Sequence, residues 1–197
     1  MPLVPLETAK FPPNLLEDPP CDHSRCWWVL HTRPRAEKAL ARHLAGRNHS
    51  FYLPLHLRQW RSRGRLLTSQ LPLFPGYVFL YGDHQSRQNA LESNLVALVL
   101  PVANQIQLQE DLRRVDRLIS VGAPLTAEER LEPGDAVAII AGPLKGMTGT
   151  VLRRSKQLRF LVEVEFLRRG VSVEVESWMI EPCSTPLSAV AEQPCSW

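Results

Sequence analysis

Apolar positions follow two different rhythms along this 197-residue chain, and the change of rhythm divides it into two parts. In the first part, short runs rich in strand formers alternate with stretches of helical spacing. Strands are predicted at 27–31, 50–56, 57–72 (as a hairpin), 76–81 and 95–100, and helices at 33–46, 85–93 and 108–119. This β-α-β-β-β-α-β-α order predicts an α+β fold, a sandwich related to the split β-α-β ferredoxin-like layout.

The second part has the two-residue period of a half-buried strand. Four alternating apolar residues run from Phe160 to Phe166, and Leu161, Glu163 and Glu165 point the other way. After a turn at 168–170, the inward alternation resumes with Val171, Val173 and Val175. Short strands separated by glycine turns predict a small five-stranded β-barrel.

The amino-acid composition of the stretches outside these elements predicts the domain boundaries. Six of the 17 prolines lie in the first 20 residues, which predicts a flexible leader rather than a packed element. The stretch 122–131 has no apolar period and is predicted to be a linker. The expected organisation is a leader at 1–26, a sandwich at 27–121, a linker at 122–131, a barrel at 132–182 and a tail at 183–197.

Charge is distributed unevenly, although the net charge is only +3. Residues 27–72 contain nine Lys or Arg and one acid, Glu37, whereas the rest of the chain has 14 basic and 19 acidic residues. Such asymmetry indicates contact with a polyanion. The alternative, a charged face that is merely solvated, does not explain a ratio of nine basic residues to one acidic residue. Arg61, Arg63 and Arg65 are spaced two apart and are expected to project from one face of an extended segment. The candidate phosphate-binding residues are Arg33, Arg35, Lys38, Arg42, Arg58, Arg61, Arg63 and Arg65.

Several function classes have no support in the sequence. No apolar run approaches the roughly 20 residues of a bilayer span, and no secretory signal is visible. The four cysteines lack zinc-ribbon spacing and are expected to be thiols in a reducing cytoplasm. No phosphate loop or hydrolase motif occurs. We therefore expect a soluble, cytoplasmic, non-enzymatic monomer with no catalytic site, cofactor or metal.

Two groups of motifs resemble one known family, in the order that the family has them. Residues 27–32 (WWVLHT) and 73–79 (LFPGYVF) resemble the N-terminal NGN domain of NusG-family transcription elongation factors. Residues 133–135 (PGD) and 142–149 (GPLKGMTG) resemble the SH3-like KOW domain that closes those proteins. The basic hairpin before Leu-Phe-Pro is closer to the specialised RfaH-like antitermination branch.

The resemblance implies that the NGN domain binds the clamp helices of the largest subunit of bacterial RNA polymerase. The implied contact residues are His31, Phe74, Tyr77 and Phe79. Aromatic side chains are favoured interface anchors, but Tyr77 and Phe79 could equally fill the core. Phe74 precedes a Pro-Gly turn and is expected to be exposed. The basic residues would then contact upstream DNA or the displaced non-template strand.

The barrel region is electrically neutral, with seven basic and seven acidic residues from 132 to 182. Its expected outer face carries Glu163, Glu165, Glu174 and Glu176, which would repel phosphate and favour a protein partner. The resemblance implies recruitment of ribosomal protein S10 or of Rho through Gly142, Leu144 and Lys145. Leu144 is either exposed for that contact or folded into the barrel.

The resemblance as a whole implies an antitermination factor that suppresses pausing. One alternative within the family is a housekeeping factor for pausing and Rho-dependent termination. Two alternatives lie outside it: a KOW-containing RNA-binding protein of the ribosome, and an enzyme with an unrecognised site in the sandwich. Binding to naked RNA with a steep salt dependence would favour the first of these.

Overall fold

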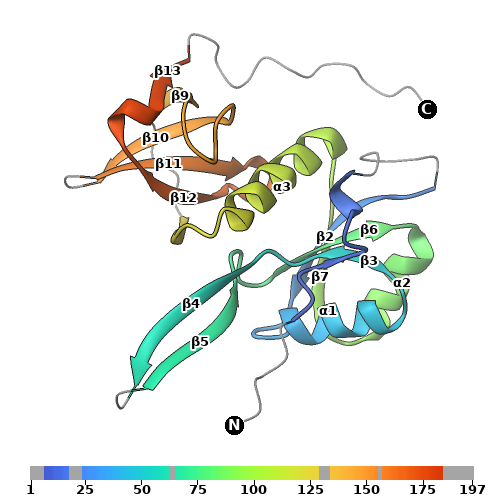
Figure 1. The fold of residues 1–197 in the computed structure, drawn as a ribbon. Coiled ribbons are helices and arrows are strands. Elements are labelled where there is room, and N and C mark those ends of the chain that lie inside the picture. The colour runs from blue at the N-terminus through green and yellow to red at the C-terminus, as the bar shows by residue number, and fades with distance from the viewer. Residues whose placement is uncertain (1–6, 18–23, 63–64, 129–133, 155–156, 184–197) are drawn as a thin grey trace.

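The protein consists of a sandwich and a β-rich unit that meet along one long helix (Figure 1). The computed structural model describes residues 7–17, 24–62, 65–128, 134–154 and 157–183. The mixed α+β class expected from the sequence is confirmed. No helix in these ranges is long and apolar enough to cross a membrane.

The sandwich is built on a five-stranded antiparallel sheet with the strand order β1-β3-β6-β2-β7. Its strands are β1 (Lys10–Phe11), β2 (Cys26–Thr32), β3 (Ser50–Tyr52), β6 (Tyr77–Gly82) and β7 (Val96–Pro101). Its helices are α1 (Glu37–Gly46), α2 (His84–Glu92) and α3 (Gln105–Ser120). Apart from β1, which was not predicted, these elements lie close to the predicted ones.

The two faces of the sheet bury different sets of side chains. On one face, Leu30 and Leu80 pack with Leu40 and Leu44 of α1 and with Ala90 of α2. The other face belongs to a larger cluster, in which side chains of the sheet, of α3 and of the β-rich unit are continuous. The strict inward and outward alternation of β2 and β6 therefore serves two cores.

Residues 7–17 form a strap against the sandwich, which corrects the expectation of a flexible leader for this part of 1–26. Lys10 and Phe11 pair with β3, and η1 (Leu15–Glu17) follows. Leu15 and Leu16 are 1% and 4% exposed. The carbonyl oxygen of Leu16 accepts hydrogen bonds from the side chains of Gln109 and Arg113 on α3. The strap was missed because its few apolar residues have no period.

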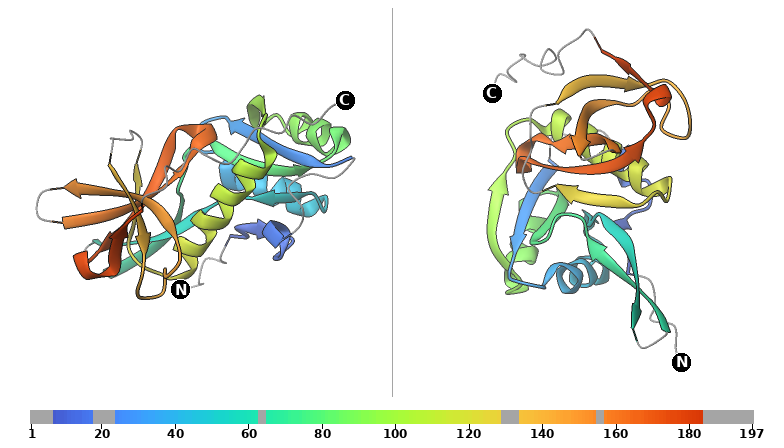
Figure 2. Two further views of the ribbon diagram at one scale, coloured as in Figure 1. Left: turned by 90° about the horizontal axis from the view of Figure 1, so that it is seen from above. Right: turned by 90° about the vertical axis from the view of Figure 1, so that its left-hand side faces the viewer.

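A two-stranded antiparallel hairpin, β4 (Leu55–Ser62) and β5 (Arg65–Pro72), forms a sheet of its own. It projects away from the body of the protein (Figures 1 and 2). The predicted strand 50–56 ends early, at Tyr52, because Leu53 and Pro54 separate β3 from the hairpin. The predicted hairpin itself is present.

The β-rich unit is a six-stranded antiparallel sheet with the order β13-β9-β10-β11-β12-β8. Its strands are β8 (Leu125–Glu128), β9 (Asp135–Ile139), β10 (Thr148–Arg154), β11 (Gln157–Val164), β12 (Arg169–Val175) and β13 (Ile180–Pro182). The expected linker at 122–131 therefore contains a strand, β8, which adds to the edge of β12. Below, "the barrel" means this unit.

The central hairpin of the barrel follows the predicted alternation except at its turn. Phe160, Val162 and Val164 are fully buried, but Phe166 lies in η2 (Glu165–Leu167) and is 36% exposed. The expectation that Phe166 points inward is wrong, because β11 ends at Val164 and the chain turns through Arg168 in the left-handed region.

A buried polar group fixes β8 to the barrel. The Ser172 hydroxyl donates to Glu128 Oε1 at 2.6 Å, and Arg159 Nε donates to the same hydroxyl at 2.9 Å. Ser172 and Glu128 are 0% and 4% exposed. Such groups are stable in the interior only when their hydrogen-bonding capacity is satisfied, so this contact specifies the position of the strand.

Candidate functional site

Three side chains form a row across adjacent strands at one end of the sandwich sheet. His31 on β2 is in register with Tyr77 on β6 and with Leu98 on β7. The rings of His31 and Tyr77 are 5.1 Å apart and both residues are partly exposed. Leu98 is 55% exposed. This row is called the sheet patch below.

The other two predicted anchors are buried next to the sheet patch, in the cluster that Tyr77 also contacts. Phe74 is 1% exposed and meets buried Phe79 edge to face, with ring centroids 6.3 Å apart. The expected exposure of Phe74 is therefore wrong, because its ring enters the core before the chain turns at Pro75 and Gly76. For Phe79 the core alternative holds, whereas Tyr77 is accessible.

The turn that presents Tyr77 is held by two hydrogen bonds to Gly76. Its backbone nitrogen donates to Glu37 Oε1 at 2.7 Å, and its carbonyl accepts from the backbone nitrogen of Thr32 at 2.8 Å. Gly76 has φ +86°, and a Cβ there would lie 3.4 Å from His31 Nε2. Glycine is therefore favoured by the backbone conformation, while a Cβ at this distance would make an ordinary contact.

Two residues of this site were missed by sequence reasoning. Glu37 had a signal, since it is the one acid among nine cations in 27–72, and it proves to be a buried support for the turn. The sequence held no signal that distinguishes Leu98 from its neighbours, because β7 is apolar throughout.

The barrel contacts the sandwich beside the sheet patch and along α3. The Arg169 guanidinium lies over the Tyr77 ring, 5.3 Å from its centroid. On α3, Arg114 and Arg117 donate to the carbonyl oxygens of Thr148 and Lys145, each at 2.7 Å. The barrel thus covers part of the surface that Tyr77 would offer to a partner.

Asp111 is the buried charged group of this junction. Its carboxylate accepts from the backbone nitrogen of Glu165 at 3.0 Å and from Gln107 Nε2 at 2.9 Å. Burial raises the pKa of Asp111 to about 6, against the opposing effects of these hydrogen bonds and of Arg114.

The predicted partner-binding residues of the barrel lie on the loop that reaches α3. Leu144 is 4% exposed, so it is folded into the barrel rather than offered to a partner. Lys145 is exposed, but its carbonyl is taken by Arg117. Gly142 has φ +81° and lies at the other end of the loop, where it is exposed.

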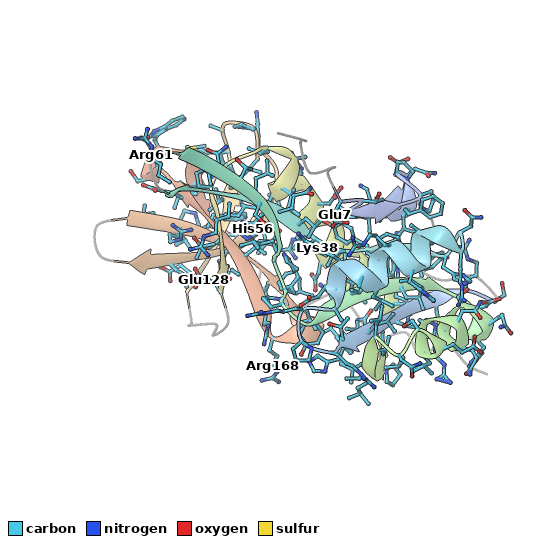
Figure 3. All side chains as sticks on the ribbon, turned by 90° about the horizontal axis from the view of Figure 1, so that it is seen from below. Glu7, Lys38, His56, Arg61, Glu128 and Arg168 are labelled. Atoms are coloured by element: carbon cyan, nitrogen blue, oxygen red, sulfur yellow. The ribbon has the colours of Figure 1, made fainter. Side chains whose placement is uncertain are left out.

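The basic residues fall into two groups. Arg33, Arg35, Lys38 and Arg42 lie at the start of α1, and Arg58 and Arg61 lie on β4. Figure 3 shows Lys38 on α1 and Arg61 toward the far end of the hairpin. All are exposed except Lys38, which is partly buried. Arg42 approaches Glu7 at 3.9 Å, a mainly exposed pair of small energetic effect.

The expectation that Arg61, Arg63 and Arg65 share one face is wrong. Position 65 is in register with Ser62, and Arg61 with Leu66, because the chain reverses between them. Positions 61 and 65 therefore fall on opposite faces of the hairpin. Arg63, and the side chain of Arg65, lie outside the described part of the chain.

Comparison with protein families decides the identity of the sandwich. The family model for NusG, described as transcription termination factor nusG, matches residues 25–127, which is 103 of 197 residues. The chain belongs to the NusG family. This NusG-family match covers four of the five strands of the sandwich sheet, leaving out β1, and it includes the three helices and the hairpin.

Solved structures are similar to this NusG-family protein at low identity. One, titled "Domain interaction in Thermotoga maritima NusG", is 18% identical over 80% of this chain and 97% of that one, with a TM-score of 0.49. Another, titled as the MjSpt4:Spt5 complex, is 18% identical over 81% and 97%, with a TM-score of 0.28. No curated protein sequence matches the chain.

Within the described ranges, no group of three or more His, Cys, Asp or Glu could hold a metal ion. A hollow of about 190 Å³ lies between the strap and α3, and its lining includes Lys10, Arg113 and Asp116. Lys10 and Asp116 form an ion pair at 2.8 Å there, so these charges serve to hold the strap.

Proposed function

We propose that this NusG-family protein is a transcription elongation factor of the antitermination type, which binds the clamp helices of bacterial RNA polymerase through the sheet patch. The observation that supports this most directly is the exposed row of Leu98, His31 and Tyr77. An aromatic and an aliphatic side chain on a rigid sheet are good anchors, because little conformational entropy is lost when they are buried. Buried Phe74 and Phe79 pack next to the row, in the cluster that Tyr77 also contacts.

The basic residues are the proposed contacts with upstream or non-template DNA. Arg58 and Arg61 extend from the body on the hairpin, where they could reach nucleic acid while the sheet patch stays on a protein partner. Arginine suits this role because its guanidinium binds phosphate oxygens in a bidentate way.

The barrel is the proposed recruiting domain, for ribosomal protein S10 or for Rho. Its exposed glutamates, Glu163, Glu165, Glu174 and Glu176, favour a protein over RNA. Because Arg117 holds the 142–148 loop and Arg169 lies over Tyr77, we infer that the barrel leaves α3 before both surfaces are used together.

The projecting basic hairpin favours the RfaH-like branch over a housekeeping NusG-type factor for pausing and Rho-dependent termination. In this proposal the protein acts in the cytoplasm as a monomer and without a cofactor. It would catalyse no reaction of its own but would shorten the pauses of the polymerase.

The test is co-migration of the full chain with purified bacterial core RNA polymerase on a sizing column. Tyr77→Ala and Leu98→Ala should each weaken binding about tenfold, as expected for interface anchors. The matched control is Ile106→Ala, which alters a side chain of similar exposure (61%) at the start of α3, near the opposite end of β2. Equal losses for all three variants, or no loss for any, would contradict the docking site.

A further inference from the structure

Trp178 is the most exposed of the large hydrophobic side chains in the described ranges, at 62%. It lies in η3 (Ser177–Met179), just before β13, and its position is fixed rather than loose. The indole Nε1 donates to Glu176 Oε2 at 2.8 Å, and the Met179 nitrogen donates to the Glu176 carbonyl at 2.9 Å. An exposed, prepositioned tryptophan is the side chain most typical of a binding hot spot.

A second apolar side chain lies on the neighbouring strand end. The nitrogen of Ile140 donates to the carbonyl of Met179 at 2.9 Å, which joins the segment after β9 to η3. Ile140 is 38% exposed. Nearby, Gly142 has φ +81°, a backbone conformation that favours glycine, and its loop packs against the end of the Met179 side chain. Two exposed apolar residues therefore lie on one hydrogen-bonded platform.

Exposed carboxylates lie around this platform, and the basic residue in register with Glu174 is Arg159 on β11, which is bound to Ser172 and Thr126. Glu174 and Glu176 are exposed and alternate with the inward residues Val173 and Val175 of β12, so they share the outer face that leads to Trp178. Glu181, on β13, is also exposed. Carboxylates beside an indole attract a cation in two ways, by charge and by the negative face of the ring.

The position of the platform separates it from the surfaces already described. The red-orange segment that carries η3 and β13 lies on the side of the barrel away from α3 (Figures 1 and 2, left). The contacts to α3 come instead from Lys145, Thr148 and Glu165. The platform is therefore accessible while the barrel is docked, unlike Tyr77.

We propose that Trp178 and Ile140, with Glu174, Glu176 and Glu181, form a docking surface for a basic segment of a partner protein, one that carries Arg or Lys next to apolar residues. This proposal rests on the proposed recruiting role of the barrel and assigns it a second surface. A cation of the partner would stack on the indole and pair with Glu176, and an apolar neighbour would cover Ile140. Because the surface stays open in the docked form, a partner bound there could be carried to the polymerase before the domains separate.

The experiment is calorimetric titration of the full chain with a 12-residue peptide of alternating Arg and Leu. The matched probe is the same peptide with Glu in place of Arg. The wild type should bind the Arg peptide and not the Glu peptide. Trp178→Ala should weaken binding of the Arg peptide about tenfold or more, and Glu176→Gln should weaken it and flatten its salt dependence. Leu57→Ala, which alters a side chain of similar exposure on β4, should change nothing.

Equal affinity of wild type, Trp178→Ala and Glu176→Gln for the Arg peptide would overturn the proposal. So would loss of binding to a single-stranded DNA oligonucleotide in Trp178→Ala, since that would make the surface a nucleic-acid site. Co-migration of Trp178→Ala with polymerase should match the wild type. If the wild type itself fails to co-migrate, the proposed function fails, while the peptide titration still decides the docking surface.

Discussion

The carboxylate of Asp111 on α3 joins the two domains by accepting a hydrogen bond from the backbone nitrogen of Glu165 in the barrel, 3.0 Å away. The residue is 1% exposed, and its other oxygen faces Gln107 and Arg114 of its own helix. An ionisable group is thus buried at the junction, which makes docking of the barrel sensitive to its protonation.

Docking of the barrel should weaken as pH rises. Burial raises the pKa of Asp111 to about 6, and separation of the domains returns the carboxyl to water, where its ordinary pKa is 3.8. The docked form holds the proton more tightly, so docking is strongest below pH 3.8 and is lost progressively as pH rises through about 6.

Energy transfer between dyes on the two domains, followed from pH 5 to 7.5, measures this dependence. Asp111→Asn should remove most of it, because an amide does not titrate there. A wild-type profile that is flat, or that closes with rising pH, would contradict the role of Asp111.

Loss of an α3 arginine should favour the separated form and so increase binding to polymerase. Arg117→Ala removes the hydrogen bond to the Lys145 carbonyl and should shift the equilibrium by about 1 kcal/mol, or about fivefold. The measurement is the apparent affinity of the full chain for core polymerase. Arg47→Ala, at the end of α1, is the control and should leave affinity unchanged; weaker binding of Arg117→Ala would mean that the arginine contacts polymerase instead.

The strap should contribute to global stability. Leu16→Ala removes a buried side chain between the sheet and α3 and should cost about 2–5 kcal/mol in the free energy of unfolding. Urea unfolding measures this, with Leu57→Ala as an exposed leucine that should cost less than about 0.5 kcal/mol. Similar losses in the free energy of unfolding for the two variants would show that residues 7–17 do not stabilise the fold.

Removal of the Ser172 hydroxyl should loosen β8. Ser172→Ala removes the hydroxyl that donates to Glu128 Oε1 at 2.6 Å in a buried site and should destabilise the barrel by about 1–3 kcal/mol. Hydrogen exchange of the amides of residues 125–128 should rise more than that of β11. Uniform exchange across the barrel would show that the hydroxyl does not act on β8 in particular.

The hairpin arginines should contribute to DNA affinity without choosing a sequence. In the double variant Arg58→Ala/Arg61→Ala, the plot of log affinity against log salt concentration should become less steep, by about one to two units of slope. The change should be the same for different DNA sequences. Fluorescence anisotropy with a forked duplex measures the slope. An unchanged slope would place the phosphate contacts on α1 alone.

Much of the fold could be predicted because its elements have strong periods. The alternation around Phe160 and Val173 and the four-residue spacing of Leu108 and Leu112 each identify a face to be buried, and a buried face fixes the element. The strap was not predicted because Leu15 and Leu16 are an isolated apolar pair. Their segment is held by hydrogen bonds from Gln109 and Arg113, about 95 residues later in the sequence.

The candidate site was predictable by residue type but not by exposure. Tyr77 and Phe79 share one face of β6, yet Phe79 is fully buried against Phe74 while Tyr77 is partly exposed. Leu98, in register with His31 on an apolar strand, is 55% exposed. Which residues of an apolar strand remain uncovered depends on how distant parts of the chain pack over the sheet, and no local pattern records that.

The most direct test of the central claim is a photocrosslink from position 98 to the polymerase. A benzoylphenylalanine replaces Leu98 in the full chain, and a second chain carries it at the control position, Ile106. The account predicts that position 98 crosslinks to the clamp helices of the largest polymerase subunit and that position 106 does not. Crosslinking from position 106 alone, or from position 98 to a different subunit, would contradict it.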